Sequence, residues 1–131
     1  MLNRCLRRYP FSCFLIVAIV LLSLLPIPEV KMAEDIPLAD KWTHMVMYGV
    51  LTLVLWLETW RARLPLSARK VCLLFLLPVA MGGLLELAQA HLTTCRSGEW
   101  LDFVANTLGV CIGTAVGSLV YLQGKRSRSS S

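Results

Sequence analysis

The stretch VCLLFLLPVAMGGLLELAQA, residues 71–90, decides the fold of this chain. Its twenty residues contain a single charged side chain, Glu86, and the basic residues Arg69 and Lys70 come directly before it. About twenty apolar residues are enough for a helix to cross the hydrocarbon core of a bilayer. The stretch therefore predicts a transmembrane helix with positive charge at one end and a carboxylate near the other.

Three further apolar segments accompany this one, and they are Phe11–Leu25, Trp42–Trp60 and Leu101–Leu122. The chain has 131 residues, of which 56% are hydrophobic, so it has room for four spans joined by short loops. Short connections make successive helices antiparallel neighbours. We therefore predict an all-α fold, a bundle of four transmembrane helices in a single membrane domain over residues 1–131.

The Lys and Arg residues are divided unequally between the two ends of these spans. Ten of the thirteen lie on one side, and they are Arg4, Arg7, Arg8, Arg61, Arg63, Arg69, Lys70, Lys125, Arg126 and Arg128. The three on the other side are Lys31, Lys41 and Arg96. Because Lys and Arg accumulate in cytoplasmic loops, this bias predicts a multi-pass protein of the cell (inner) membrane with both termini cytoplasmic. The outer side then collects most of the acids, namely Glu29, Glu34, Asp35, Asp40, Glu99 and Asp102.

The first segment has a second interpretation, because Arg4 to Arg8 followed by an apolar run also resembles a secretory signal peptide. The residues that follow it, 26–31, offer no small-x-small cleavage site. We therefore expect the first helix to be retained. Its removal would leave three spans and an external N-terminus.

The formal net charge is +5, which in a soluble protein would suggest a nucleic-acid partner. Here the basic residues flank apolar spans, and anionic lipid headgroups attract such segments. We therefore expect membrane lipids as partners and no nucleic acid.

Small residues recur along the last predicted span, where Gly109, Gly113 and Gly117 follow one another at four-residue spacing. Such a stripe lets another helix approach closely. The approaching helix belongs either to the same bundle, which we favour, or to a second copy in a homo-oligomer.

Polar residues gather at the outer ends of the last three predicted spans. The residues of each span are three or four positions apart, so they share one face of their helix. We expect the three faces to converge on one outward-facing polar pocket. The candidate binding residues are Asp40, Lys41, His44, Tyr48, Glu86, Gln89, Arg96, Asp102 and Asn106.

Glu86 carries the sharpest signal in this set. A carboxylate exposed to lipid costs several kcal/mol, so Glu86 is expected to face protein, water or a partner. Two interpretations stay open, a hydrogen-bonded network that fixes helix packing and a site for a headgroup, a proton or a metal. Glu58, near the inner end of its span, is expected to snorkel or to pair with Arg61 at the i,i+3 spacing.

The set consists of acids, amides, one histidine, one tyrosine and two basic residues, Lys41 and Arg96. His44, Glu86 and Asp102 are candidates for acid/base catalysis on a lipid-linked phosphate or sugar, with Arg96 holding an anionic headgroup. The sequence contains no HExxH or clustered His/Cys pattern, so we predict no metal or other cofactor. A divalent cation held by His44 with Asp40, Glu86 and Asp102 is left open as a weaker alternative.

At these residues the chain resembles the VanZ-like family, small multi-pass membrane proteins named after a glycopeptide-resistance determinant. The matching pieces are Asp40-Lys41-x-x-His44 with Tyr48, then Glu86-x-x-Gln89, then Arg96 through Asp102, Asn106 and Gly109. They cover residues 40–117. The resemblance implies a membrane-embedded helical domain with an envelope role, which in the namesake is low-level resistance to teicoplanin. It implies that the polar positions are site residues, without assigning them a reaction.

Three functions follow as hypotheses. The leading one is an envelope protein that binds a lipid-linked or cell-surface component at the polar pocket and influences envelope properties or glycopeptide susceptibility. The second is a membrane enzyme that uses acid/base chemistry on a lipid headgroup, in which Glu86→Gln abolishes activity without preventing folding. The third is a structural or partner-binding module, in which Gly113→Leu does more damage than Glu86→Gln.

Overall fold

The computed structural model describes residues 2–25, 38–92 and 99–129. Within these ranges the chain forms five helices and no strand, so the predicted all-α fold is confirmed for the described residues. The helices are α1 (Leu2–Arg8), α2 (Pro10–Leu24), α3 (Ala39–Arg61), α4 (Ala68–Leu92) and α5 (Trp100–Ser129).

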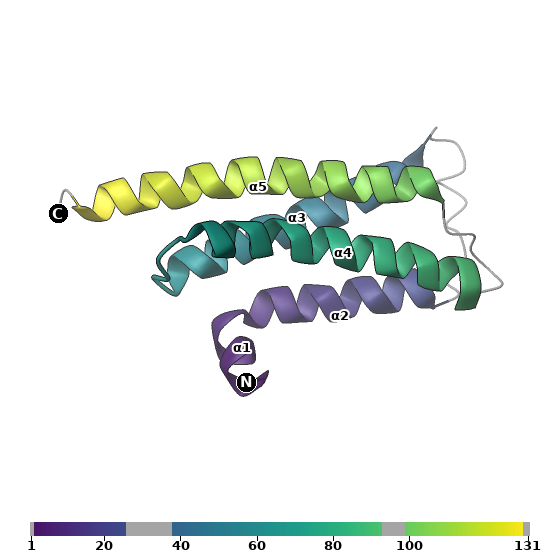
Figure 1. Cartoon of the computed structure of the whole chain (residues 1–131), viewed down its shortest axis with the longest axis horizontal. Coiled ribbons are helices and arrows are strands. Elements are labelled where there is room, and N and C mark those ends of the chain that lie inside the picture. Colours follow the sequence, from purple (N-terminus) through teal and green to yellow (C-terminus); the bar gives the residue numbers. More distant parts are fainter. Residues whose placement is uncertain (1, 26–37, 93–98, 130–131) are drawn as a thin grey trace.

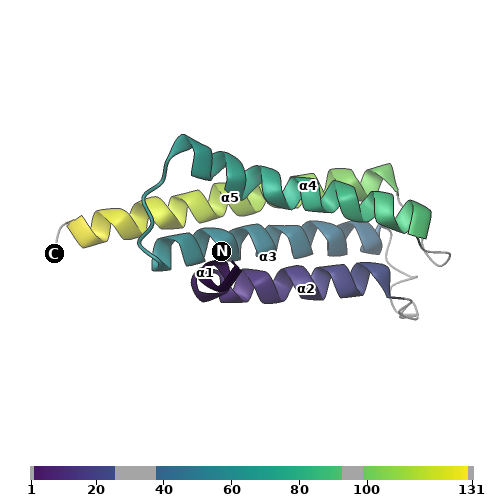
Figure 2. The same cartoon turned by 60° about the horizontal axis from the view of Figure 1, so that its bottom comes forward.

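Helices α2 to α5 lie along one another with alternating direction, as Figure 1 shows. The short α1 turns away from the bundle axis, and it lies at the same end of the bundle as the last turns of α5 (Figures 1 and 2). The α3–α4 connection is at this end as well. The other end brings together the last turn of α2, the first turn of α3, the last turn of α4 and the first turn of α5.

The four predicted spans correspond to α2, α3, α4 and α5, with different bounds. Helix α5 continues seven residues past the predicted end at Leu122, through Lys125 and Arg126. Helices α4 and α5 are long and apolar enough to cross a membrane. Helix α2 is apolar but has 15 residues, and α3 has 23 residues but carries charged side chains near both ends. The short helix α1 was not predicted.

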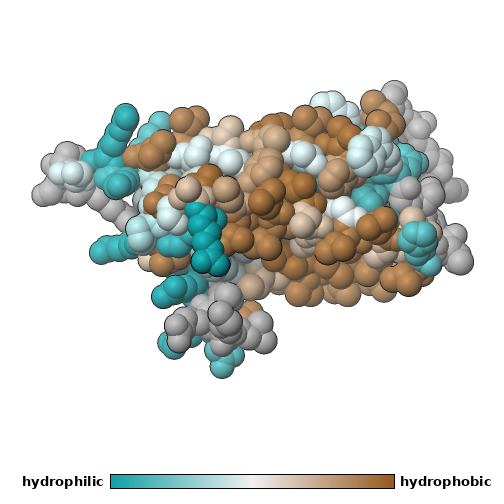
Figure 3. All heavy atoms as spheres, viewed as in Figure 1, coloured by the Kyte–Doolittle hydropathy of each residue, from teal (hydrophilic) through white to brown (hydrophobic). Residues whose placement is uncertain are grey.

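Large apolar side chains cover much of the bundle surface. Phe14, Leu77, Leu84 and Ile112 are among those that are more than half exposed. Figure 3 shows hydrophobic residues over the middle of the molecule, with hydrophilic residues toward its two ends. A water-soluble helical bundle buries its apolar side chains along one stripe of each helix, so this distribution is unlike that of a soluble bundle.

Helices α3 and α5 pack the most extensively of all pairs, and glycine makes this possible. A Cβ atom added to Gly109 would collide with the backbone carbonyl oxygen of Met45, and one added to Gly113 would lie 2.5 Å from that of Gly49. A Cβ atom at Gly117 would lie 2.5 Å from the Trp56 side chain. The stripe therefore serves a contact within the chain, as we favoured. A homo-oligomer through the same glycines stays a prediction, and it would have to displace α3.

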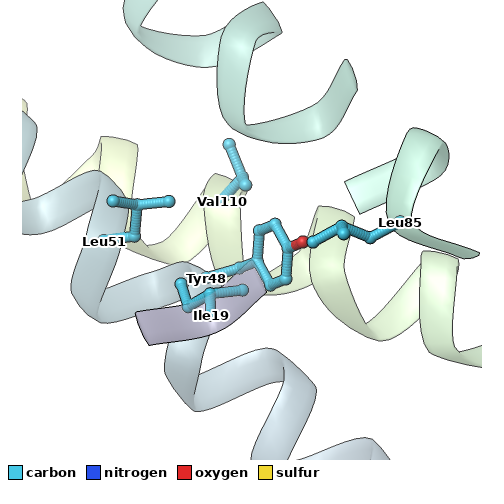
Figure 4. Packing of buried hydrophobic residues seen from close by; sticks show 5 residues of the cluster. All are labelled: Ile19, Tyr48, Leu51, Leu85 and Val110. Atoms are coloured by element: carbon cyan, nitrogen blue, oxygen red, sulfur yellow. The ribbon is translucent and has the colours of Figure 1, made fainter. Parts of the chain in front are cut away.

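The hydrophobic interior consists of two clusters. The first lies in the middle of the bundle and draws on α2, α3, α4 and α5, and Figure 4 shows its buried members, Ile19, Tyr48, Leu51, Leu85 and Val110. The second lies nearer the α3–α4 connection and contains Trp56, Leu74 and Tyr121. Together the two clusters hold the four long helices in register beneath the polar residues at the end of the bundle.

Glu58 caps helix α2 from the neighbouring helix α3. The residue before α2, Tyr9, makes no side-chain capping hydrogen bond, so the first N–H groups of α2 need another acceptor. The Glu58 carboxylate accepts hydrogen bonds from Phe11 N at 2.8 Å, Ser12 N at 3.1 Å and Ser12 Oγ at 2.5 Å. The expected pairing with Arg61 gives way to this cap, because a helix N-terminus carries partial positive charge and donors that already point at the carboxylate.

Candidate functional site

Seven polar residues meet at the end of the bundle where α3 and α5 begin and α4 ends. We call them the polar cluster, and they are Asp40, Lys41, His44, Glu86, Glu99, Asp102 and Asn106. Six of them are among the predicted binding residues. Of the remaining predicted residues, Tyr48 and Gln89 lie elsewhere in the bundle, and Arg96 falls outside the described residues.

The buried part of the polar cluster joins one side chain from each of three helices. Nδ1 of His44 on α3 lies 3.1 Å from Oδ1 of Asn106 on α5, and Nδ2 of Asn106 donates to Oε1 of Glu86 on α4 at 3.4 Å. All three residues are buried. Because the Asn106 amide donates through its nitrogen, its oxygen accepts from His44, so the His44 proton resides on Nδ1. The ring is thereby held in one orientation, with Nε2 directed toward Asp40.

The second oxygen of Glu86 faces the start of helix α5. Its Oε2 accepts a hydrogen bond from the backbone N–H of Glu99 at 3.3 Å. The carbonyl of Glu99 in turn accepts from the backbone N–H groups of Asp102 and Phe103, at 3.0 and 3.4 Å. The carboxylate of Glu86 therefore lies where the partial positive charge of the helix N-terminus stabilises it.

Lys41 links the buried part of the cluster to its exposed edge. Its ammonium forms ion pairs with Glu99, with Asp102 at 2.9 Å and with Asp40 at 3.9 Å. The side chains of Asp40 and Glu99 are 46% and 49% exposed, whereas that of Asp102 is 6% exposed. Lys41 precedes the predicted span, and its pKa is raised above the usual range, chiefly by the hydrogen bond to Glu99 and then by that to Asp102. It therefore stays an ammonium at neutral pH.

Gly82 on α4 makes room for this arrangement. A Cβ atom there would lie 3.2 Å from Nδ2 of Asn106 and 3.3 Å from a ring carbon of Tyr48. Any larger residue would push Asn106 away from Glu86, which lies one turn further along α4. The glycine thus lets α5 bring its amide between the histidine and the carboxylate.

Two predicted site residues have surroundings that the spacing did not indicate. Tyr48 lies in the first hydrophobic cluster, together with Ile19 and Leu85 (Figure 4). Gln89 points toward α2, where its Nε2 donates to the backbone oxygen of Ser23 at 2.9 Å. That oxygen belongs to the last turn of α2, whose carbonyls have no partner within the helix, so Gln89 ties the end of α2 to α4.

Glu99 is the member of the polar cluster that the sequence analysis did not single out. It comes three residues before Asp102, and this i,i+3 spacing could have placed the two carboxylates on one face of the helix start. It positions Glu86 through its backbone N–H, a donor that every residue except proline supplies, so no sequence signal marks that contact.

A cavity of about 550 Å³ lies at the opposite end of the bundle, between α2 and α3. Its lining is mostly apolar and includes Phe14, Val54 and Trp60, with Glu58 and Arg61 as the charged residues. None of the residues that line this cavity belongs to the polar cluster, so the cavity is a separate feature.

The polar cluster includes a set of metal-ligating groups. Asp40, His44 and Asp102 each offer one ligand atom, and these atoms lie within 4.8 Å of one another. The set is the one that the sequence analysis left open for a divalent cation, except that Glu86 uses its oxygens on Asn106 and on the start of α5.

Comparisons with protein-family models, with curated proteins and with solved structures found no match. The resemblance to VanZ-like proteins rests on the residue pattern of the chain itself.

Proposed function

We propose that the chain is a multi-pass membrane protein whose helices α2, α3, α4 and α5 all cross the bilayer. The most apolar windows of α4 and α5 are only 28% and 33% buried, whereas the core helix of a soluble protein is mostly buried. Helix α2 is about 22 Å long at 1.5 Å per residue, and a bilayer accommodates a short span by local thinning. The exposed apolar side chains over the middle of the bundle support the same arrangement.

The two ends of the bundle differ in charge, and this supports the orientation. Arg7 and Arg8 on α1, Arg61 at the end of α3 and Lys125 and Arg126 on α5 belong to one end. The acid-rich polar cluster belongs to the other. With the basic end in the cytoplasm, both termini are cytoplasmic and the polar cluster faces the outside.

At the outer face, the polar cluster binds the polar head of a lipid-linked or cell-surface envelope component. The observation that carries this proposal is the buried contact of His44, Glu86 and Asn106 beneath the exposed edge of the cluster. Buried ionisable groups give a fold little stability compared with well-packed apolar ones, and within membranes they usually serve function. Carboxylates and an amide accept hydrogen bonds, so the ligand is one that offers hydroxyl or amine donors.

The proposed family is the VanZ-like family, for which the support is the residue pattern over positions 40–117. Its pieces lie on α3, α4 and α5, and six of its polar positions contact one another in the polar cluster. By this proposal the protein binds its envelope component and thereby influences envelope properties, including susceptibility to teicoplanin.

Conservative substitutions test the proposed site. Glu86→Gln, His44→Ala and Asp102→Asn are compared with wild type for membrane insertion, thermal stability in detergent and teicoplanin susceptibility of the cell. Ser118→Ala, on an exposed face of α5, is the matched control. Variants that insert and melt like wild type but lose the phenotype support the site. If stability and phenotype fall together, the cluster is a packing network and the proposal is withdrawn.

A second function, acid/base catalysis on a lipid headgroup, is favoured by one specific contact. Nδ1 of His44 lies 3.7 Å from Oε1 of Glu86, and the Asn106 amide contacts both groups, so the cluster places an imidazole beside a buried carboxyl group, the pair of groups that acid/base catalysis uses. An enzyme of this kind loses turnover in Glu86→Gln while it still binds its headgroup. A binding protein loses affinity instead, and this difference separates the two functions.

A further inference from the structure

The outer edge of the polar cluster brings together one imidazole and two carboxylates from two helices. Asp40 and His44 lie one turn apart on α3, and Asp102 comes from the first turn of α5. The ligand atoms of the three side chains lie within 4.8 Å of one another. We propose that Asp40, His44 and Asp102 bind a divalent cation of the Mn²⁺ or Zn²⁺ kind.

The orientation of His44 is the first argument for this site. Its Nδ1 lies against Asn106 Oδ1, so Nε2 is the ring nitrogen that faces the acids. The nearest of these atoms, Asp40 Oδ1, lies 3.7 Å from Nε2, which is longer than a hydrogen bond. Histidines that bind metals are held in this way, with the other ring nitrogen donating to an oxygen.

Asp102 supplies the second argument. Its side chain is 6% exposed, and its buried Oδ1 lies 2.9 Å from the Lys41 ammonium, which is its charged partner among the described residues. The polar cluster contains four carboxylates, those of Asp40, Glu86, Glu99 and Asp102, against the single ammonium of Lys41. Uncompensated charge in a buried site is strongly destabilising, and a divalent cation brings the cluster closer to neutrality.

The ammonium of Lys41 competes with the ion for the carboxylate of Asp102. Its ammonium lies 2.9 Å from Asp102 and also pairs with Glu99. It can stay with Glu99 at the exposed edge when a metal takes Asp102. Ligand atoms around a metal at about 2.1 Å are at most about 4.2 Å apart, so the site must contract slightly. The side chain of Asp40, which is 46% exposed, lies at the edge of the cluster.

The donor set decides which ions fit. Mg²⁺ and Ca²⁺ prefer sites made of oxygen, whereas imidazole favours first-row transition metals and Zn²⁺. One nitrogen and two carboxylate oxygens therefore select Mn²⁺ or Zn²⁺ over Mg²⁺. The inference goes beyond the proposed envelope function, because the ion binds whether or not a lipid-linked component does.

Calorimetric titration of the full chain tests the site directly. The chain is purified in detergent, treated with a chelator and titrated with Mn²⁺ or Zn²⁺ in the absence of any lipid-linked compound. We expect one saturable site per chain, with affinity reduced at least tenfold in Asp102→Asn and in His44→Gln. Lys41→Gln removes the competing ammonium and should raise the affinity. His91→Gln, which alters the exposed histidine at the end of α4, is the matched control and should change nothing.

A spectroscopic measurement on the wild-type chain tests the site even if a variant folds poorly. In the wild-type chain, bound Mn²⁺ should show the electron spin-echo modulation of one histidine nitrogen, unchanged in His91→Gln. The site is refuted if wild type and Lys41→Gln both lack saturable binding, if folded Asp102→Asn binds as tightly as wild type, or if bound Mn²⁺ shows no nitrogen coupling. Because no headgroup is present, these outcomes do not depend on the proposed envelope function.

Discussion

Removing the carboxylate of Glu58 should detach the start of helix α2 from α3. The carboxylate accepts hydrogen bonds from Phe11 N, Ser12 N and Ser12 Oγ. Hydrogen bonds to charged groups contribute roughly 1.5–3 kcal/mol each. The hydrogen bond from Phe11 N is only partly buried, whereas the two from Ser12 are buried, so only the two Ser12 donors are counted in full. At the lower value for each, Glu58→Ala destabilises the chain by about 3 kcal/mol.

A graded series makes this prediction specific. Ser12→Ala removes only the hydroxyl donor and should cost about 1.5 kcal/mol. Glu58→Gln keeps one acceptor oxygen but turns an amide nitrogen toward the donors, so its effect should fall between those of Ser12→Ala and Glu58→Ala. The free energy of unfolding is measured in mixed detergent micelles, with helicity as the signal. The cap is refuted if Glu58→Ala destabilises the chain by less than about 1 kcal/mol or no more than Ser12→Ala does.

Two further predictions concern packing and topology. Gly113→Ala should destabilise the chain by about 1–3 kcal/mol, because the added Cβ atom collides with the backbone of α3. Gly83→Ala should destabilise it less, because the Cβ atom added there meets only the edge of the Phe103 ring, at 3.2 Å. Equal unfolding free energies for the two variants would contradict the close α3–α5 contact. In a cysteine-free background, a membrane-impermeant thiol reagent should label a cysteine at Leu38 from outside intact cells and one at Ser129 only after lysis. Labelling of both in intact cells would contradict the proposed orientation.

Much of the fold can be predicted from local patterns. Long apolar runs predicted α4 and α5, and the glycine spacing of α5 indicated a close helix contact, because both signals depend on neighbouring residues. The short helix α1 carries no such apolar run and was missed. The cap at Glu58 was also missed, because a carboxylate and the donors of α2 lie 46 and 47 residues apart in sequence and meet only through the packing of α2 on α3.

Part of the candidate site could also be predicted from a local pattern, the spacing of polar residues along each helix. Helical spacing placed His44, Glu86 and Asn106 on faces that converge, and these three side chains do meet. Spacing gives a direction around a helix but not the depth of a side chain in the bundle. Tyr48 shares the face of His44, yet it lies one turn deeper, among hydrophobic residues. Gln89 shares the face of Glu86, yet it bonds to α2 because that helix lies beside its turn of α4.

Native mass spectrometry of the full chain, extracted from its own membranes, tests the central claim most directly. If the polar cluster binds a lipid-linked or cell-surface component, wild type and Ser118→Ala should retain that component as a discrete added mass, and Glu86→Gln and Asp102→Asn should lose it while keeping their thermal stability. The same added masses in all four proteins, or no bound component in wild type, would contradict the claim.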